Sequence, residues 1–343
     1  MRVESAEIYA LDFSSWKRAS VRQSFPTSRV HFVSRADKVP ADAWLAVWGM
    51  RELPFGLAAG VRVVRLEDGF LRSVGLGADL IRPMSWVVDK RGLYYDARSV
   101  SDIEVLLNEA VFSAAMIARA RALRERVVNS CVTKYNVGHR EWQAPGGDKR
   151  LILVLGQVES DAALAFGAPG IRRNMNLLRA VREANAHAYV VYKPHPDVVA
   201  RLRAAGEDEH LALQWCDEMV TDASIDQLLA AANEVHVMTS LAGFEALLRG
   251  KAVTCYGHPF YAGWGLTTDV VPMSRRRRVL SLDELVFAAL IAYPVYFDRQ
   301  GQGQITPEVA LDQLLAWRTA NGTKTPWWRA LKRVILRQVV RVK

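Results

Sequence analysis

The feature that most constrains the fold is a regular alternation of apolar and helical segments between residues 150 and 257. Buried β-strands are predicted at RLILVLGQ (150–157), AYVVYKPHPD (188–197), EVHVMTS (234–240) and KAVTCYG (251–257). Helices are predicted between them at NMNLLRAVREAN (174–185), SIDQLLAAAN (224–233) and GFEALLRG (243–250). Strands and helices that alternate across short loops form right-handed βαβ units, so this region predicts a doubly wound parallel sheet.

Similar signals earlier in the chain predict a second unit of the same kind. WLAVWG (44–49) and VRVVRLEDG (61–69) are typical of buried parallel strands, and residues 101–128 are predicted to form one helix that Ser101 caps. The run Pro145-Gly146-Gly147 is the strongest linker signal in the chain. The predicted fold class is therefore α/β, with two Rossmann-like domains facing each other across a cleft. The expected boundaries are 1–145 and 146–300, followed by C-terminal helices at 301–343.

The chain carries an excess of positive charge, with 45 Lys and Arg against 36 Asp and Glu, a net charge of +9 and a pI near 9.6. Such a protein is expected to bind phosphates, acidic sugars, nucleic acid or an anionic membrane, unless it is a soluble protein that happens to be basic. The basic residues concentrate at 275–278 and 326–343. Outside the C-terminal segment they are not interleaved with aromatic residues, which argues against nucleic acid as the partner.

The three cysteines and the absence of targeting signals predict a cytoplasmic protein. Cys131, Cys216 and Cys255 are odd in number and far apart, so they form neither a disulfide framework nor a metal cluster. We find no apolar run long enough to span a membrane and no secretory signal at the N-terminus. No HExxH, paired CxxC, GxxxxGK[ST] or GxSxG motif occurs, so the metalloprotease, zinc-ribbon, P-loop and elbow-type hydrolase classes have no support.

Acidic residues follow two of the predicted strands, at the edge where open α/β sheets bind ligands. Glu67 and Asp68 are adjacent, so their charges repel and one of them is expected to hold a proton near neutral pH. The alternative is that they cap a helix or pair with Arg72. Gln157 and Asp161 follow the strand at 150–155, and there helix N-capping by Asp161 or its neighbour is the simpler interpretation.

A rigid corner follows the strand at 188–192. His195 lies between Pro194 and Pro196, and both prolines restrict the backbone around it. With Lys193 beside it, the imidazole is expected to form a cationic or hydrogen-bond-donating site for phosphate. A single histidine is more often structural, but the KPHP arrangement is a more specific signal.

Hydroxyl groups follow the strand at 234–238. Thr239 and Ser240 precede a helix expected to begin near Gly243, and the free backbone N–H groups of a helix N-terminus attract anions. Glu245 is expected in the first turn of this helix. It would either bind the hydroxyls of a ribose or complement the helix dipole.

Four segments together resemble the capsule polysaccharide β-Kdo glycosyltransferases, the KpsC-like family. They are EDGFLRSVGLG, GQVESD, YKPHPD and TSLAGFEALLRGKAVTCYGHPFYAGWGLTTD, and the resemblance extends from about residue 44 to residue 296. Members of the family often carry two such modules, whereas this chain has room for one. The resemblance implies a GT-B-like fold, CMP-Kdo as the donor substrate, no metal or other cofactor, and a glycolipid acceptor in the cytoplasm.

The resemblance also implies roles for the residues at the strand ends. Residues 1–145 would form the acceptor-side domain and residues 146–300 the CMP-sugar domain. Because Kdo is β-linked in both the donor and the family product, the reaction would retain configuration, with Asp161 as nucleophile. Either Glu67 or Asp68 would then handle the acceptor proton. The CMP-sugar would contact Gln157, Lys193, His195, Pro196, Thr239, Ser240 and Glu245.

Two other functions remain open. The acidic pair, the His-Pro motif and the hydroxyl pair also resemble those of bacterial CMP-sialic acid transferases, so the donor could be another CMP-activated acidic sugar. Alternatively, the chain is a non-catalytic module that binds sugar nucleotide or capsule chain and organises export partners.

The C-terminal segment TPWWRALKRVILRQVVRVK predicts an amphipathic helix. Its arginines at 329, 333, 337 and 341 form a basic stripe, and apolar residues line another face. One interpretation is an interfacial helix on anionic lipid, and the other is a helix packed back across the two domains. The lipid-linked acceptor implied by the family favours the first, with peripheral attachment to the inner membrane.

Overall fold

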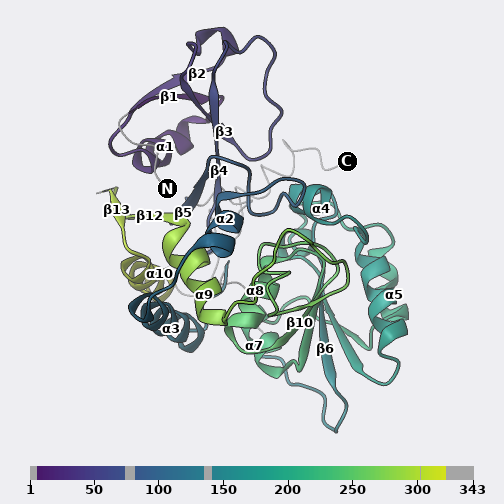
Figure 1. The fold of residues 1–343 in the computed structure, drawn as a ribbon. Helices are drawn as coiled ribbons and strands as arrows, with labels where there is room; N and C mark the ends of the chain where they lie inside the picture. The colour runs from purple at the N-terminus through teal and green to yellow at the C-terminus, as the bar shows by residue number, and fades with distance from the viewer. Residues whose placement is uncertain (1–5, 74–81, 135–140, 302, 322–343) are drawn as a thin grey trace.

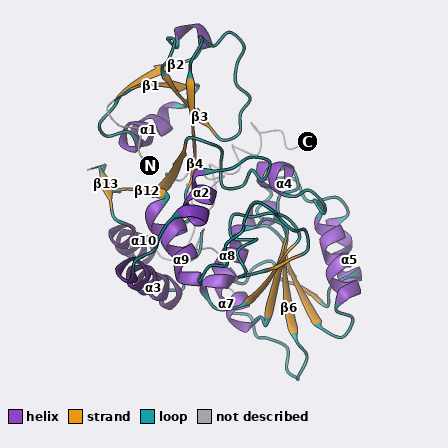
Figure 2. Ribbon diagram, in the orientation of Figure 1, coloured by secondary structure: helices purple, strands orange, loops and turns teal. Residues whose placement is uncertain are grey.

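The protein is built from two β-sheets with helices packed around them (Figure 1). The computed structural model describes residues 6–73, 82–134, 141–301 and 303–321. The second sheet has six strands, all parallel, in the order β11-β10-β9-β6-β7-β8 (Figure 2). These strands are β6 (Leu151–Leu155), β7 (Tyr189–Lys193), β8 (Glu218–Met219), β9 (Glu234–Val237), β10 (Ala252–Cys255) and β11 (Thr268–Asp269).

Helices cover both faces of this sheet, as expected of a doubly wound arrangement. Side chains of β6 alternate between the faces: Ile152 and Val154 belong to the same apolar cluster as α5 (Asn174–Ala184). Leu151 and Leu153 share the opposite cluster with α7 (Ile225–Ala231) and α8 (Leu241–Leu248). The strands and helices predicted between residues 150 and 257 are all found, with small differences at their ends. The structure adds elements that were not predicted, among them α4 (Ala162–Gly167), α6 (Pro196–Val199) and β8.

The first sheet is mixed rather than parallel throughout. Its seven strands run in the order β13-β12-β5-β4-β3-β1-β2. The pairings from β2 to β4 are parallel, as predicted for the segments 44–49 and 61–69, and those from β4 to β13 are antiparallel. The strands are β1 (Glu7–Leu11), β2 (Arg29–Val33), β3 (Trp44–Trp48), β4 (Arg62–Asp68), β5 (Ser85–Asp89), β12 (Pro294–Phe297) and β13 (Gln304–Ile305).

The chain thus returns to the first sheet after it has completed the second. The predicted domain boundaries stay predictions. One continuous apolar core contains Leu123 of α3 (Ala114–Asn129), Phe244 of α8, Leu285 of α9 (Leu282–Val286) and Leu311 of α10 (Pro307–Asn321). Because this core spans both halves of the molecule, the two sheets are held in a fixed relationship.

The prediction of a single helix over residues 101–128 is wrong. Ser101 does cap a helix, since its side chain accepts a hydrogen bond from the Glu104 backbone, but α2 (Asp102–Glu109) ends at Ala110. Arg278 Nη1 donates to the Ala110 carbonyl at 2.7 Å. This carbonyl therefore accepts from a side chain in place of the backbone N–H that a continuing helix would offer it. Ser113 then caps α3 as a separate helix.

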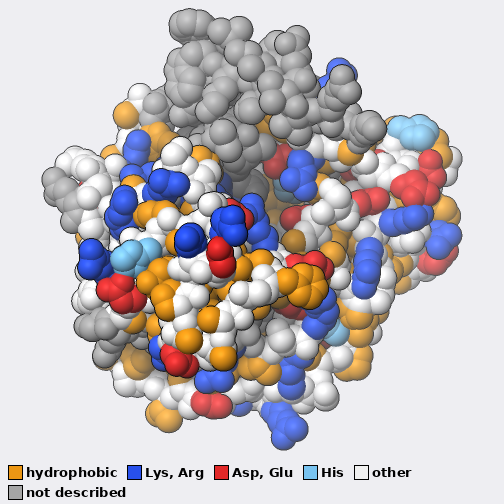
Figure 3. Space-filling view, turned by 90° about the horizontal axis from the view of Figure 1, so that it is seen from above, with side chains coloured by type: hydrophobic (Ala, Val, Ile, Leu, Met, Phe, Trp, Pro, Cys, Tyr) orange, Lys and Arg blue, Asp and Glu red, His pale blue; other side chains and the backbone are white. Residues whose placement is uncertain are grey.

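The arginines of the basic run at 275–278 mostly form ion pairs and hydrogen bonds within the protein. Arg276, with 8% of its surface exposed, pairs with Glu104 at 3.1 Å, and Arg275 pairs with the same carboxylate. Arg18 and Arg22 are exposed and lie over the ring of Phe32. On the face that Figure 3 shows, Lys and Arg side chains are interspersed with acidic and hydrophobic ones.

Within the described residues, no helix is both long and apolar enough to cross a membrane. The predicted interfacial helix at the C-terminus lies outside the described residues.

Candidate active site

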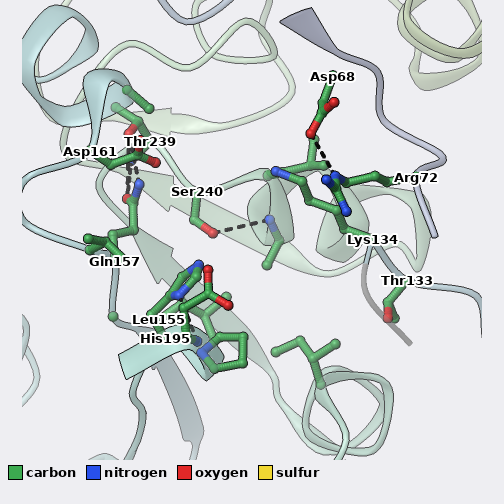
Figure 4. Close-up of a pocket in the computed structure, with 18 of the residues that line it drawn as sticks. Asp68, Arg72, Thr133, Lys134, Leu155, Gln157, Asp161, His195, Thr239 and Ser240 are labelled. Carbon is green, nitrogen blue, oxygen red and sulfur yellow. Dashed lines mark hydrogen bonds and ion pairs between the residues drawn. The ribbon is translucent and has the colours of Figure 1, made fainter. Parts of the chain in front are cut away.

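A cavity of about 710 Å³ lies where the carboxyl ends of strands from both sheets meet. Figure 4 shows Asp68 and Arg72 on one side of it and Asp161 and Thr239 on the other, with Ser240 between them. Every residue predicted to belong to the site lines this cavity: Glu67, Asp68, Gln157, Asp161, Lys193, His195, Pro196, Thr239, Ser240 and Glu245. The structure therefore brings them together, while their chemical roles stay predictions.

The two neighbouring acids at the end of β4 have different surroundings. Asp68 forms an ion pair with Arg72 at 2.6 Å. This pairing is the alternative to a role in proton exchange that the sequence left open for the two acids. Among the described residues Glu67 forms no ion pair; it accepts hydrogen bonds from the Asp68 backbone at 2.9 Å and the Tyr95 hydroxyl at 3.2 Å. Burial, with a smaller contribution from the Asp68 charge, raises the pKa of Glu67 to about 7. Glu67 is thus the acid that exchanges a proton near neutral pH.

A glycine after the acids is required by the packing of β4 on β5. A Cβ atom on Gly69 would lie 2.4 Å from the Ser85 hydroxyl oxygen, and the Gly69 N–H donates to the Ser85 carbonyl at 2.9 Å. Any side chain at position 69 would push the strands apart and displace the acids beside it. Gly69 thereby fixes where Glu67 and Asp68 enter the cavity.

Asp161 lies at the N-terminus of α4 (Ala162–Gly167) and is exposed to the cavity. Its side chain accepts a hydrogen bond from the Ala162 backbone at 2.9 Å, so it does cap this helix. Burial raises the pKa of Tyr94 well above its usual value, and the charges of Glu67, Asp68 and Asp161 add to this effect. The charges of all three carboxylates thus act on one tyrosine of the cavity wall, so capping does not remove Asp161 from the group.

The corner after β7 is basic but the histidine in it is neutral. Burial, reinforced by the charges of Lys134 and Arg203, lowers the pKa of His195 to about 3. His195 Nδ1 accepts a hydrogen bond from the Asp197 backbone at 3.2 Å, so the neutral ring carries its proton on Nε2. Of the two predicted behaviours, the structure favours a hydrogen-bond donor over a cation.

Lys193 supplies a cation at the same corner. Its Nζ donates to the Ala223 carbonyl at 2.8 Å, and burial lowers its pKa to about 8. Lys134 and Arg203 also line the cavity, and their charges act on His195. Such a cluster is suited to phosphate oxygens.

The two hydroxyl residues after β9, Thr239 and Ser240, have different roles. The Thr239 backbone N–H donates to Gln157 Oε1 at 2.8 Å, and Gln157 Nε2 donates to Thr239 Oγ1 at 3.0 Å. Both residues are buried. This pair ties the end of β6 to the end of β9. Ser240 caps α8 by accepting from the Ala242 backbone at 3.3 Å, and the first turn of α8 borders the cavity.

Glu245 has a different place from the one predicted. Because α8 begins at Leu241, Glu245 lies in the second turn rather than the first and does not complement the helix dipole. Its carboxylate accepts a hydrogen bond from the Lys134 backbone at 2.6 Å, and burial raises its pKa to about 7. Glu245 therefore holds the segment after α3 against α8, which positions Lys134 at the cavity.

Several lining residues were not predicted from the sequence. Lys17, Trp16 and Trp48 form part of the wall near Glu67 and Asp68. Other lining residues that were missed are Tyr94, Tyr95, Lys134 and Arg203. Most of them lie on loops or turns, whose path the sequence does not indicate, and Trp48 is the last residue of β3.

Comparisons with known proteins all point to one family. The model described as "Capsule polysaccharide biosynthesis protein" matches residues 55–145 and 122–297. The chain is 42% identical over 319 residues to "Capsule polysaccharide modification protein LipA" of Neisseria meningitidis serogroup B, covering 90% of this chain and 45% of LipA. It is 38% identical over 298 residues to "Lipopolysaccharide-processing protein LpsZ" of Rhizobium meliloti, covering 84% of this chain and 67% of LpsZ. The chain thus spans less than half the length of LipA.

Two solved structures from Thermosulfurimonas dismutans are similar over nearly their whole length. The first, "KpsC, beta Kdo 2,7 transferase", has a TM-score of 0.76 and 40% identity, covering 91% of this chain and 99% of that one. The second, "KpsC, beta Kdo 2,4 transferase", has a TM-score of 0.78 and 27% identity, with the same coverage.

Proposed function

The chain belongs to the capsule polysaccharide biosynthesis protein family and is KpsC-like, and from this premise we propose that it is a retaining β-Kdo glycosyltransferase. It would transfer Kdo from CMP-Kdo to a glycolipid acceptor in capsule polysaccharide synthesis, with its two halves arranged in the GT-B manner. The observation that carries this proposal is 40% identity to a β-Kdo transferase across 99% of that chain. A cavity lined by both acids and phosphate-binding groups supports it.

The basic corner suits the departure of CMP. As the bond between C2 of Kdo and the phosphate oxygen breaks, negative charge grows on the phosphate. His195 Nε2–H, Lys193, Ser240 and the N–H groups of the first turn of α8 would donate to that charge. One well-placed donor of this kind typically stabilises a transition state by about 3 kcal/mol.

The acids suit the two remaining steps. Asp161 would attack C2 of Kdo as CMP leaves and form a covalent sugar adduct. The acceptor hydroxyl would then attack C2, release the Asp161 carboxylate and give its proton to Glu67. A pKa of about 7 allows Glu67 to be deprotonated before the step and to accept a proton during it.

Asp161 has both a structural and a proposed chemical role, and two variants separate them. Asn is an equally good helix cap but a poor nucleophile, whereas Ala is neither. We expect Asp161→Asn to retain wild-type stability and CMP binding but to lose transfer. Asp161→Ala should lose transfer and about 1 kcal/mol of folding stability, measured by denaturant unfolding. Transfer at the wild-type rate by Asp161→Asn would leave only the capping role.

The reaction itself is tested with CMP-Kdo and a short synthetic Kdo-lipid acceptor, with the product linkage determined by NMR. The higher identity to the 2,7 transferase than to the 2,4 transferase, 40% against 27%, favours a 2,7 linkage. Competition by CMP-sialic acid would reveal a different donor. CMP binding without turnover would indicate the non-catalytic alternative. We further propose that the protein acts in the cytoplasm, peripherally attached to the inner membrane where the lipid acceptor lies.

A further inference from the structure

A lysine and two tryptophans form a part of the cavity wall that the mechanism above does not use. Lys17 ends a short 3₁₀ turn (Ser15–Lys17) just before α1 (Arg18–Ser24). Its Nζ lies 3.0 Å from the centroid of the Trp48 ring and 5.3 Å from that of Trp16. All three side chains line the cavity, and 37% of the Trp16 surface is exposed.

The Lys17 ammonium group has charge and hydrogen-bonding capacity left over. In the described part of the chain, no carboxylate lies within ion-pair distance of it and no hydrogen bond leaves it. Asp68 is held by Arg72 at 2.6 Å and Glu67 by the Tyr95 hydroxyl, so neither acid neutralises the lysine directly. An ammonium group has three donors and the face of Trp48 engages it on one side, which leaves donors for a ligand.

The position of this group relative to the rest of the cavity indicates what it binds. Lys17 and Trp48 belong to the first sheet and its connections, as do Glu67 and Asp68, whose charges act on Lys17. Lys193 and His195 lie at the end of β7 in the second sheet. A ligand beside Lys17 would thus lie near the acids and away from the proposed CMP phosphate.

We propose that Trp16, Lys17 and Trp48 form an acceptor subsite for an acidic sugar, in which Lys17 binds the carboxylate and Trp16 packs against the ring. A cation beside an exposed aromatic face matches a sugar acid, which presents a carboxylate on an otherwise apolar and hydroxyl-bearing ring. This inference rests on the proposed glycosyltransferase function, because it assigns the acceptor end of the same cavity.

The test pairs a change in the protein with a change in the substrate. Lys17→Met removes the charge and keeps the length of the side chain. We expect it to raise the KM for a Kdo-lipid acceptor roughly 10- to 100-fold, as the loss of a charge-assisted hydrogen bond does, with the KM for CMP-Kdo unchanged. With the wild type, an acceptor whose terminal carboxylate has been reduced to an alcohol should show a similar rise in KM. With Lys17→Met, reducing that carboxylate should raise the acceptor KM almost no further.

Arg18→Met is the matched control. Arg18 is the next residue, has the same charge, and lies over Phe32 outside the cavity, so its loss should leave both KM values unchanged. Trp16→Ala should raise the acceptor KM as well, with folding checked by its melting temperature.

The outcomes separate this inference from the proposed function. Absence of Kdo transfer by the wild-type protein would overturn the function. Wild-type transfer with an unchanged acceptor KM in Lys17→Met would overturn the subsite alone. A rise in the KM for CMP-Kdo instead would place Lys17 on the donor and would also overturn it.

Discussion

At the scale of single residues, the surroundings of Glu67 and Asp68 give two adjacent carboxylates different properties. Arg72 pairs with Asp68 and keeps that charge satisfied, whereas Glu67 is buried against Tyr95 with its pKa raised to about 7. A base is useful when its pKa lies near the working pH, because it is then both available and strong enough. This difference favours Glu67 over Asp68 as the group that takes the acceptor proton.

The pH dependence of transfer tests this assignment. If Glu67 is the base, kcat/KM should rise with pH and level off above about pH 7, because only the deprotonated carboxylate accepts a proton. Glu67→Gln should lower kcat by roughly 10²- to 10⁴-fold, the usual contribution of general base catalysis, and remove that limb of the profile. Rates are measured from pH 5 to pH 9 at saturating donor. A limb near pH 7 that persists in Glu67→Gln would assign the titration to another group.

At the scale of helices and strands, the sequence predicts the second sheet well because its strands are buried on both faces. Leu151–Leu155 is buried at every position, and such an apolar run followed by a helix has few alternative interpretations. The strands β1 and β2 escape prediction because β1 has only two buried residues and β2 has none, and because a helix with little apolar character joins them. The strand β12 pairs with β5, about two hundred residues earlier in the chain, and no local pattern encodes that pairing.

The same limit applies to the site. Residues at or just beyond the ends of buried strands, such as Lys193 and Ser240, could be placed from the sequence because parallel strands end at one edge. Lys17 and Tyr94 lie on connections whose path depends on tertiary packing. The break after α2 depends on Arg278, which is far away in the sequence.

The burial of Glu245 in α8 makes folding stability depend on pH. The pKa of Glu245 is raised from 4.5 to about 7, so the folded state binds the proton more tightly than the unfolded state. The stability that this proton contributes is fully present below pH 4.5 and is lost as the pH rises through 7. The shift corresponds to a free energy of unfolding on the order of 3 kcal/mol.

We therefore expect Glu245→Gln to lose less stability than the wild type between pH 5 and pH 8, because the amide has no charge to bury. Unfolding in urea across this pH range measures the difference. Glu109→Gln serves as the control, since Glu109 is exposed near the end of α2 and its replacement should leave the slope unchanged. Equal slopes for Glu245→Gln and the wild type would contradict the argument.

At the scale of the whole molecule, each sheet contributes one wall of the cavity, and Asp161, which follows β6, lies with the second wall. The acids of β4 come from the first sheet, and the basic corner and the α8 N-terminus come from the second. A single apolar core joins the sheets behind these walls. Binding of CMP should therefore depend on the second wall and be independent of the first.

Separate measurements of CMP binding and transfer test this division. Lys193→Met and His195→Ala remove donors from the second wall and should weaken CMP binding, whereas Glu67→Gln should bind CMP as tightly as the wild type and fail only in transfer. At a CMP concentration 100 times Kd, binding stabilises the folded state by about 2.7 kcal/mol, enough to be measured as a rise in melting temperature. Glu67→Gln should show the full rise, and the two second-wall variants a smaller one. If Glu67→Gln lost the rise as well, the nucleotide would have to contact both walls, and the acceptor would need another entrance to the acids.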